Sequence, residues 1–309
     1  MKKDLVICHT PLQMEIVYSL IKSGIISNFD FVVIGNNTEQ LKYYFDKINE
    51  FSDNGIFIKE TKRFTYLTNT LKLILNFGFK NYKTIFLANV EKCYIHSMLS
   101  NCYFETINTF DDGTANIVKD SMLFRNFVMN SKQKTFSKLL RTKFNKDDII
   151  NLSSKHYTLY IDKENIISNT EEVKLSLYDC KTIGNGNAVV LLGSVYDYIS
   201  TKPDRLIKSL NYMFSEKFYY IPHPRDNHNH FDNGVLIDGV EIAEVKILNL
   251  LSVYETVTVY GFNSSAQLNL NNNDRINIKC FVGDLLDINK VDLGLNEIKV
   301  YGQSNCSIS

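Results

Sequence analysis

The sequence predicts an α/β protein made of two Rossmann-like halves, each built on a parallel sheet. Buried-strand patterns alternate with helical patterns along most of the 309 residues, which is the order of βαβ units. The strand-like runs also carry Val, Ile and Phe on consecutive positions, as is typical of strands that are buried on both faces. We place the boundary after residue 154, which predicts domains 1–154 and 155–309.

In the first half, short apolar runs indicate strands, and apolar residues at helical spacing indicate helices. The expected strands are 5–9, 29–35, 56–58, 84–89 and 105–110, and the expected helices are 12–21, 39–51 and 71–77. Residues 117–150 are rich in Lys, Arg and Phe and are expected to be helical. Residues 156–161 form a strand-like run that leads into a linker or into the second domain.

The βαβ order restarts near residue 188. The expected strands are 188–194, the first part of 217–225, 255–261 and 277–281, and the expected helices are 196–214 and 240–251. In open parallel sheets, ligands bind outside the carboxyl ends of the strands. The polar residues that follow each strand are therefore the candidates for function.

The composition excludes several classes of protein. Thirty-four Lys and Arg balance 34 Asp and Glu, so the chain lacks the basic excess of a nucleic-acid binder. Its N-terminal apolar run is too short for a secretory signal, and no run has the roughly 18 apolar residues of a transmembrane helix. We expect a cytoplasmic protein, either free or attached peripherally to the inner face of the cytoplasmic membrane.

The cysteines predict reduced, mostly buried thiols, because they are scattered and form no CxxC pair. They are Cys8, Cys93, Cys102, Cys180, Cys280 and Cys306. Their spacing suits no zinc site. His223, His228 and His230 lie near Asp226, but this spacing matches no helical or finger site. We therefore expect no metal and no cofactor.

The first chemical motif is FDDGTAN, residues 110–116, just after a strand-like run. Adjacent carboxylates followed by glycine suit a turn that presents an acid to a sugar hydroxyl, which the acid could orient or deprotonate. The alternative is an ordinary Asp-Gly turn, in which the acids cap backbone groups.

The second motif is YYIPHPRD, where His223 lies between two prolines and Arg225 follows. The prolines restrict the backbone and hold the imidazole in one direction. An imidazole and a guanidinium together suit a phosphate leaving group. The alternative is a loop histidine without a role.

Two further motifs follow strands of the second half. In LLGSVYD, Gly193 and Ser194 allow a ligand to approach the backbone, and Asp197 lies in the first turn of the next helix. In YGFNSSAQ, Ser264 and Ser265 begin a helix whose amides could hold a phosphate. The alternatives are a carboxylate that only complements the helix dipole and a serine that only caps the helix. No GxGxxG, P-loop or GxSxG motif is present.

The sequence resembles the bacterial sialyltransferases of glycosyltransferase family 52, which include lipooligosaccharide and capsular enzymes. The matching segments are LVICHTPLQ, LANVEK, TFDDGTAN, LLGS with its following Asp, HPR and YGFNSSAQL, in this order along nearly the whole chain. The resemblance implies a GT-B fold, in which the two Rossmann-like domains face a central cleft. It also implies CMP-sialic acid as donor and metal-independent, inverting transfer to a galactoside.

The resemblance also implies roles for individual residues. Asp197 matches the family's general base, although two residues separate it from Ser194 where the family has one. Asp112 stays a second candidate, because a related sialyltransferase family uses the acid of its own DDG motif. His223 matches the acid that acts on the departing CMP, beside Pro224 and Arg225. Glu244, or alternatively Glu241, matches the acid that binds the ribose.

The remaining expected contacts divide between the two substrates. Donor contacts are expected from Gly193, Ser194, Ser264 and Ser265, and acceptor contacts from Thr10, Gln13, Asp111 and Gly113. The resulting hypothesis is a sialyltransferase whose N-terminal domain binds the acceptor and whose C-terminal domain binds the donor. It would act on a terminal galactose of a surface glycan and form an α2,3 linkage. The alternatives are a transferase with another nucleotide-sugar donor and a non-catalytic sugar-nucleotide binder. A homodimer is compatible with the sequence.

Overall fold

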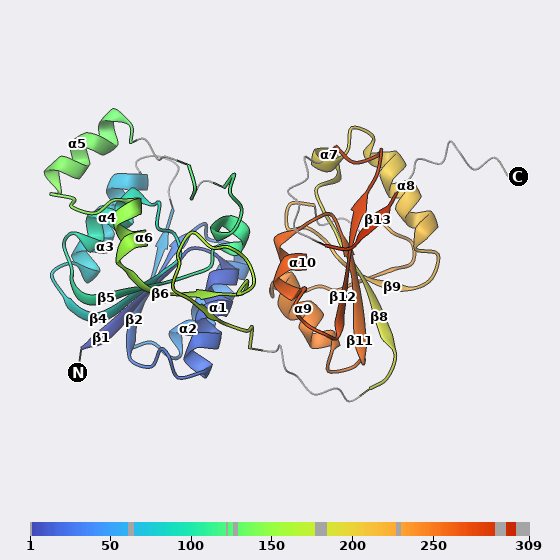
Figure 1. The fold of residues 1–309 in the computed structure, drawn as a ribbon, viewed down its shortest axis with the longest axis horizontal. Coiled ribbons are helices and arrows are strands. Elements are labelled where there is room, and N and C mark those ends of the chain that lie inside the picture. The colour runs from blue at the N-terminus through green and yellow to red at the C-terminus, as the bar shows by residue number, and fades with distance from the viewer. Residues whose placement is uncertain are drawn as a thin grey trace, which may run out of the picture. The chain divides into compact units, whose positions relative to one another are not determined.

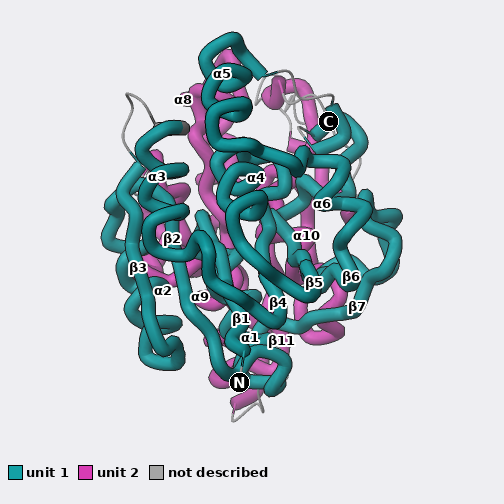
Figure 2. Tube along the Cα trace, turned by 90° about the vertical axis from the view of Figure 1, so that its left-hand side faces the viewer, with its two compact units in different colours: residues 1–176 teal, residues 177–309 magenta. Residues whose placement is uncertain are grey.

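The computed structural model contains two compact units, residues 1–176 and 177–309 (Figures 1 and 2). It describes residues 2–60, 65–121, 123–125, 129–176, 184–226, 230–287 and 295–300. Each unit has its own parallel sheet and its own hydrophobic core, so each is described by itself.

The described residues of the first unit form seven strands and the helices between them. The strands are β1 (Lys3–Cys8), β2 (Phe29–Gly35), β3 (Asn54–Lys59), β4 (Asn81–Leu87), β5 (Tyr103–Phe110), β6 (Ser153–Thr158) and β7 (Thr170–Glu172). The helices are α1 (Pro11–Lys22), α2 (Glu39–Asn49), α3 (Thr65–Phe77), α4 (Cys93–Leu99), the 3-10 helix η1 (Gly113–Asn116), α5 (Ser131–Leu139) and α6 (Lys146–Leu152).

The first sheet has the order β3-β2-β1-β4-β5-β6-β7, and every neighbouring pair is parallel. The chain first adds strands on one side of β1 and then continues on the other side. Because parallel crossovers are right-handed, this reversal places successive helices on opposite faces of the sheet. Figure 1 shows α1 and α2 on one face and α3 and α4 on the other. This is a Rossmann order, as predicted.

The second unit repeats the same order, with six strands in the part of it that the structure describes. They are β8 (Asn187–Leu192), β9 (Phe218–Ile221), β10 (Gly234–Leu236), β11 (Thr256–Gly261), β12 (Ile276–Val282) and β13 (Glu297–Lys299). The sheet runs β10-β9-β8-β11-β12-β13 and is parallel throughout. Its helices are α7 (Tyr196–Ile199), α8 (Pro203–Met213), α9 (Ala243–Leu250) and α10 (Ser265–Leu270).

The predicted burial of the strands on both faces is confirmed most clearly for β2, in which all seven residues are buried. Leu5, Ile7, Val32 and Ile85 contribute to the first core, on which α3 and α4 pack. The second core is mainly aromatic and includes Tyr196, Phe214, Tyr220 and Phe281. Burial of this apolar surface stabilises each unit separately.

The boundary between the units lies later than predicted. Ser153–Thr158 pairs with β5 and Thr170–Glu172 pairs with β6, so both strands extend the first sheet. The strand-like run at 156–161 therefore belongs to the first unit, and this unit ends at Ser176 instead of residue 154. The local apolar pattern could not reveal which sheet this strand would join.

Ser176 is held by a buried carboxylate of the first helix. Glu15 of α1 is only 1% exposed. One of its oxygens forms an ion pair with Lys47 at 2.7 Å, and the other accepts a hydrogen bond from the Ser176 hydroxyl at 2.8 Å. These contacts join α1, α2 and the last residue of the unit.

Two predicted helical stretches are interrupted. Within 117–150 the described helices are α5 and α6, each begun by a capping box, at Asn130 and Asn145. The expected helix 196–214 is divided into α7 and α8, because Pro203 begins a new helix at its first position. Helix α4 and the short strands β7, β10 and β13 were not predicted.

No helix in the described ranges combines the length and the apolar character needed to cross a bilayer. Cys8, Cys93, Cys102 and Cys280 are free thiols, as predicted. Cys180 and Cys306 lie outside the described residues.

Helix α3 offers a matched test of the first core. Leu73 is fully buried and Leu75 is 83% exposed, although the two lie on the same helix. We expect Leu73→Ala to lower the free energy of unfolding by about 2–5 kcal/mol, because it leaves a cavity. Leu75→Ala should change it by no more than about 0.5 kcal/mol. Urea denaturation of the full chain measures both, and equal losses would contradict the packing of α3.

Candidate active site

The strand order of each sheet marks one place where functional residues can gather. The order reverses between β1 and β4 in the first sheet and between β8 and β11 in the second. The loops that leave the carboxyl ends of these strand pairs diverge there and leave room for a ligand. The predicted residues Thr10 and Gln13 follow β1, whereas Gly193 follows β8 and Ser264 follows β11.

In the first unit, two carboxamides hold the carboxylate of Asp112. The Gln13 side-chain amide donates to Asp112 Oδ1 at 2.6 Å, and the Asn89 amide donates to Asp112 Oδ2 at 2.6 Å. Gln13 also donates to Asn89 Oδ1 at 2.9 Å. The loops after β1, β4 and β5 thus converge on one carboxylate, which we call the Asp112 cluster: Gln13, Asn89 and Asp112.

This environment raises the pKa of Asp112. Desolvation is the main cause, and the charge of Asp111 adds to it. The hydrogen bonds from Gln13 and Asn89 and the charge of Lys92 act in the opposite direction. A half-buried carboxylate with a raised pKa and fixed orientation is suited to accept a proton.

The sequence of the first helix explains how Gln13 reaches the cluster. Thr10 caps α1, its hydroxyl accepting a hydrogen bond from the Gln13 backbone N–H at 3.3 Å, and Pro11 begins the helix. The Gln13 side chain orients Asp112 through its hydrogen bond. Because Gln13 is fully buried, the prediction that it contacts an acceptor directly is corrected to this orienting role. Thr10 remains partly exposed. Gly113 follows Asp112 with a φ of 57°, a conformation that favours glycine.

His9 belongs to the same region, although its sequence context did not predict a role for it. Its backbone N–H donates to Gln13 Oε1 at 2.6 Å, and its Nε2 lies 2.9 Å from the Tyr94 hydroxyl. Desolvation, together with the charge of Lys92, lowers the pKa of His9 to about 3, so the ring is neutral. Its position directly after β1, beside the predicted Thr10, is the signal that could have indicated it.

Asp111 has a different role from the one predicted. It is fully buried, and its oxygens accept hydrogen bonds from the Thr158 hydroxyl, the Leu159 backbone and the imidazole of His156. A side chain with these contacts cannot bind an acceptor. The expectation of an acceptor contact at Asp111 is therefore corrected to a structural contact.

In the second unit, the loop after β9 fixes the tautomer of His223. The Arg225 backbone N–H donates to His223 Nδ1 at 3.1 Å, which leaves the proton of the neutral ring on Nε2. Desolvation, then the charge of Arg225, lowers the pKa of His223, while Asp226 opposes them. Pro224 and Arg225 are exposed, and the Arg225 guanidinium lies 5.6 Å from the centre of the Tyr198 ring. His223 can thus donate a hydrogen bond through Nε2.

Gly193 allows the loop after β8 to approach His223. Its N–H donates to the Ile221 carbonyl at 2.8 Å. A Cβ at this position would lie 2.6 Å from the Tyr220 hydroxyl and 3.1 Å from the His223 backbone nitrogen. Glycine is required here because of this close approach, and Ser194 follows it at the surface of the loop.

Asp197 lies on the four-residue helix α7 and is exposed. The neighbouring Tyr196 is buried, and its ring packs edge-on against Phe262 and His230. This packing directs Tyr196 inward, and Asp197 lies on the opposite, solvent side.

Ser264 caps α10, as the capping alternative predicted. Its hydroxyl accepts a hydrogen bond from the Gln267 backbone, and the Gln267 side chain accepts one from the Ser264 N–H at 3.1 Å. Asn263, with a φ of 61°, turns the chain into this cap. Ser265 is exposed beside it. The strands that lead to the two loops, β11 and β8, are neighbours, and Phe262 before the cap packs against Tyr196 after β8.

Glu244 lies in the first turn of α9 and is 5% exposed. One of its oxygens accepts a hydrogen bond from the Asn269 amide at 2.6 Å, which joins α9 to α10. The alternative residue, Glu241, is partly exposed and contacts Asn249 at 3.5 Å.

Within the described residues, no three His, Cys, Asp or Glu side chains gather as metal ligands would. His230 Nε2 lies 3.1 Å from Asp226 Oδ1 and packs against Tyr196. His228 lies outside the described residues. The predicted independence from metals and cofactors stays a prediction.

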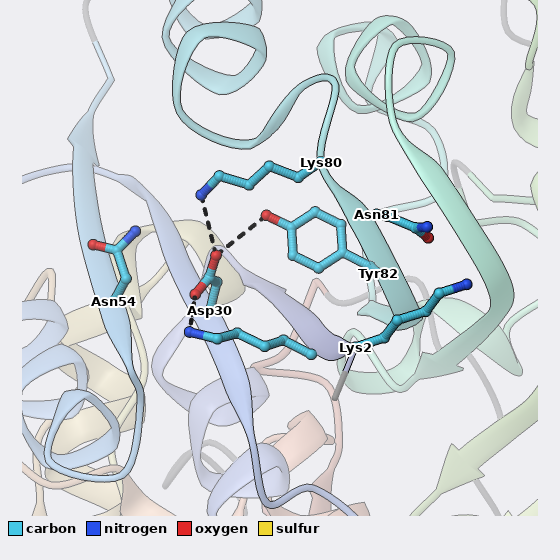
Figure 3. A pocket seen from close by; sticks show the side chains of 7 residues that line it. Lys2, Asp30, Asn54, Lys80, Asn81 and Tyr82 are labelled. Carbon is cyan, nitrogen blue, oxygen red and sulfur yellow. Dashed lines mark hydrogen bonds and ion pairs between the residues drawn. The ribbon is translucent and has the colours of Figure 1, made fainter.

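A pocket of about 610 Å³ lies at the amino edge of the first sheet, opposite the Asp112 cluster (Figure 3). At its centre, the 4% exposed Asp30 accepts hydrogen bonds from Lys80 and Tyr82, each at 3.3 Å, and pairs with Lys3 at 3.6 Å. None of the predicted site residues lines it. The carboxyl edges of the sheets therefore remain the candidate sites.

The family model described as Glycosyltransferase family 52 matches residues 27–282. A CMP-N-acetylneuraminate:beta-galactoside alpha-2,3-sialyltransferase of Pasteurella multocida is 30% identical over 89% of this chain and 90% of its own length. N-acetyllactosaminide alpha-2,3-sialyltransferases of Haemophilus influenzae and Neisseria meningitidis are 27% and 26% identical, over 89% and 86% of this chain and 91% and 75% of their own lengths.

Among solved structures, a UDP-N-acetylglucosamine 2-epimerase aligns with 97% of this chain and 84% of its own, at a TM-score of 0.53 and 9% identity. This likeness supports the pair of Rossmann-like domains and carries no information about substrates.

The environment of His223 can be tested without substrate. Because the Arg225 charge lowers the pKa of His223, Arg225→Gln should raise that pKa. The bond from the Arg225 backbone to Nδ1 should persist, since it does not use the replaced side chain. NMR titration of the imidazole measures the shift, and Arg205→Gln, an exposed change on α8, is the control. An unchanged or lower pKa would contradict the geometry of the loop.

Proposed function

The chain belongs to glycosyltransferase family 52, and on that premise we propose that it transfers sialic acid from CMP-sialic acid to a terminal galactose of a bacterial surface glycan. The proposed transfer forms an α2,3 linkage, inverts the anomeric centre and needs no metal. The observation that carries the proposal is the likeness, over about nine tenths of the chain, to an enzyme named for this donor and this acceptor class.

The proposed reaction needs one group that accepts a proton and one that stabilises the leaving phosphate. The acceptor hydroxyl loses its proton as its oxygen bonds to the anomeric carbon. The bond from that carbon to the phosphate oxygen breaks, and CMP leaves. The bond-breaking transition state resembles an oxocarbenium ion, in which negative charge develops on the phosphate.

We assign the base to Asp112. Its carboxylate is half-buried, its two oxygens are oriented by Gln13 and Asn89, and its pKa is raised. Asp197 is the alternative from the family pattern, but it is exposed on a short helix. The Asp112 environment supports proton transfer more strongly.

The second unit supplies the groups proposed for the donor. His223 carries a proton on Nε2 and suits a hydrogen bond to the leaving phosphate, and the nearby Arg225 adds positive charge. Gly193, Ser194, Ser264 and Ser265 belong to the loops at the β8 and β11 ends, and Glu244 is the proposed ribose contact. Thr10 and Gly113 are proposed to contact the acceptor.

The base assignment is tested with paired variants. Asp112→Asn keeps the shape of the side chain but removes its basicity, so kcat should fall by roughly 100- to 10,000-fold. Asp197→Asn, on the exposed helix, should lower kcat by less than about ten-fold. CMP release from CMP-sialic acid with lactose measures both. The reverse ranking would assign the base to Asp197.

The same assay tests the reaction itself. Wild-type protein should release CMP faster with a galactoside than without one, and His223→Ala should slow the release. Turnover only with another nucleotide sugar would support a different donor. Nucleotide binding without turnover of any donor would indicate a binding protein instead of an enzyme.

A further inference from the structure

Behind the Asp112 cluster lies a buried carboxylate–imidazole pair that the proposed mechanism does not use. His156 of β6 and Asp111 at the end of β5 are both fully buried. His156 Nε2 lies 2.9 Å from Asp111 Oδ1, and its Nδ1 lies 2.8 Å from the Thr109 hydroxyl. Asp111 and Thr109 therefore fix the imidazole of His156 at both nitrogens.

The other contacts of Asp111 tie the end of β5 to the neighbouring strand. Asp111 Oδ2 accepts hydrogen bonds from the Leu159 N–H at 2.7 Å and the Thr158 hydroxyl at 2.9 Å. The Asp111 N–H donates to the Tyr157 carbonyl at 3.2 Å. The fully buried carboxylate thus accepts hydrogen bonds from His156, Thr158 and Leu159. These bonds hold it in one orientation, because moving it would leave buried polar groups unpaired.

Asp112 follows directly, and its direction depends on this anchor. Its own N–H donates to Asn116 Oδ1 at 3.0 Å, and Gly113 then turns the chain with a positive φ. With Asp111 fixed on one side and η1 on the other, the Asp112 side chain faces the amides of Gln13 and Asn89.

We propose that Asp111 and His156 are a buried positioning pair, which holds the turn after β5 so that the Asp112 carboxylate meets the acceptor hydroxyl. This inference rests on the proposed function, because it takes Asp112 as the base. Asp111 and His156 touch no substrate and act only through Asp112. A misplacement of about 1 Å in a reacting group can lower a rate by about 100-fold, which is why such an anchor matters.

The pair also acts through charge. The charged or titratable groups that act on Asp112 are Asp111 beside it, Lys92 from the loop after β4 and the thiol of Cys8 on β1. His9, whose N–H donates to Gln13, is neutral. Asp111 raises the pKa of Asp112 and Lys92 lowers it. A base works above its pKa, so removing the Asp111 charge should move the acidic limb of the pH–rate profile to lower pH.

The experiment uses three substitutions in the full chain. Asp111→Asn keeps the shape and removes the charge. His156→Phe removes the donor to Asp111, and His156→Gln restores an amide donor there. The matched control is Asp30→Asn, which removes another buried carboxylate of the same sheet at the amino edge, in the pocket of Figure 3. Each variant is measured for kcat, acceptor KM, pH profile and thermal unfolding.

The positioning role predicts a specific pattern. His156→Phe should lower kcat by about ten-fold or more, with acceptor KM within about two-fold of wild type, because orientation of the base is lost and binding is not. His156→Gln should recover most of the rate. Asp111→Asn should shift the acidic limb to lower pH, and Asp30→Asn should affect stability alone.

Three outcomes would overturn the inference. The first is an acidic limb that does not shift in Asp111→Asn. The second is a loss of kcat in His156→Phe that is no larger than its loss of folded protein, as expected for the control Asp30→Asn. The third is full activity in Asp112→Asn, which would mean that the pair does not position the base. If wild type turns over no donor, the proposed function fails by itself. NMR titration of Asp112 then tests the pair directly, since Asp111→Asn should still lower the Asp112 pKa.

Discussion

Parallel pairing sends the carboxyl ends of all strands to one edge of a sheet, and this constraint determines where each functional residue lies. In both units the strand order reverses beside the first strand, β1 or β8, so the loops on either side of the reversal diverge. Asn89 and Asp112 follow strands on one side of the first reversal, and Gln13 follows β1 itself. The apolar strands thus bring together three polar side chains that are far apart in the sequence.

Much of this arrangement was predictable from local patterns. The strand Phe29–Gly35 was predicted at its exact bounds because it is apolar along its whole length, and both Rossmann-like units follow from the alternation of strands and helices. Helix α4 was missed because it has only seven residues, all of them buried, and so shows no polar face. The end of the first unit was misplaced because pairing between β5 and β6 depends on register, which a single apolar run does not encode.

The site was predictable as a set of loops but not as a set of contacts. The DDG motif indicated a carboxylate near a turn, yet the two aspartates have opposite environments. Asp111 faces β6 and is fully buried, whereas Asp112 faces the loops after β1 and β4 and is half-buried. The contacts that distinguish the two aspartates come from β6 for Asp111 and from the loop after β4 for Asp112, so the DDG motif alone does not reveal which one is buried. Likewise, Gln13 and Asn89 are 76 residues apart, so their hydrogen bond has no signature in local sequence.

The contact between Glu15 and Ser176 has a practical consequence for dissecting the chain. Glu15 follows Gln13 by two residues on α1, and its buried carboxylate shares its oxygens between Lys47 and Ser176. A fragment that ended at residue 154 would lose most of β6, all of β7 and one partner of this carboxylate. An expression fragment of the first unit should therefore extend through Ser176, so that the helix bearing Gln13 keeps both partners of its buried Glu15.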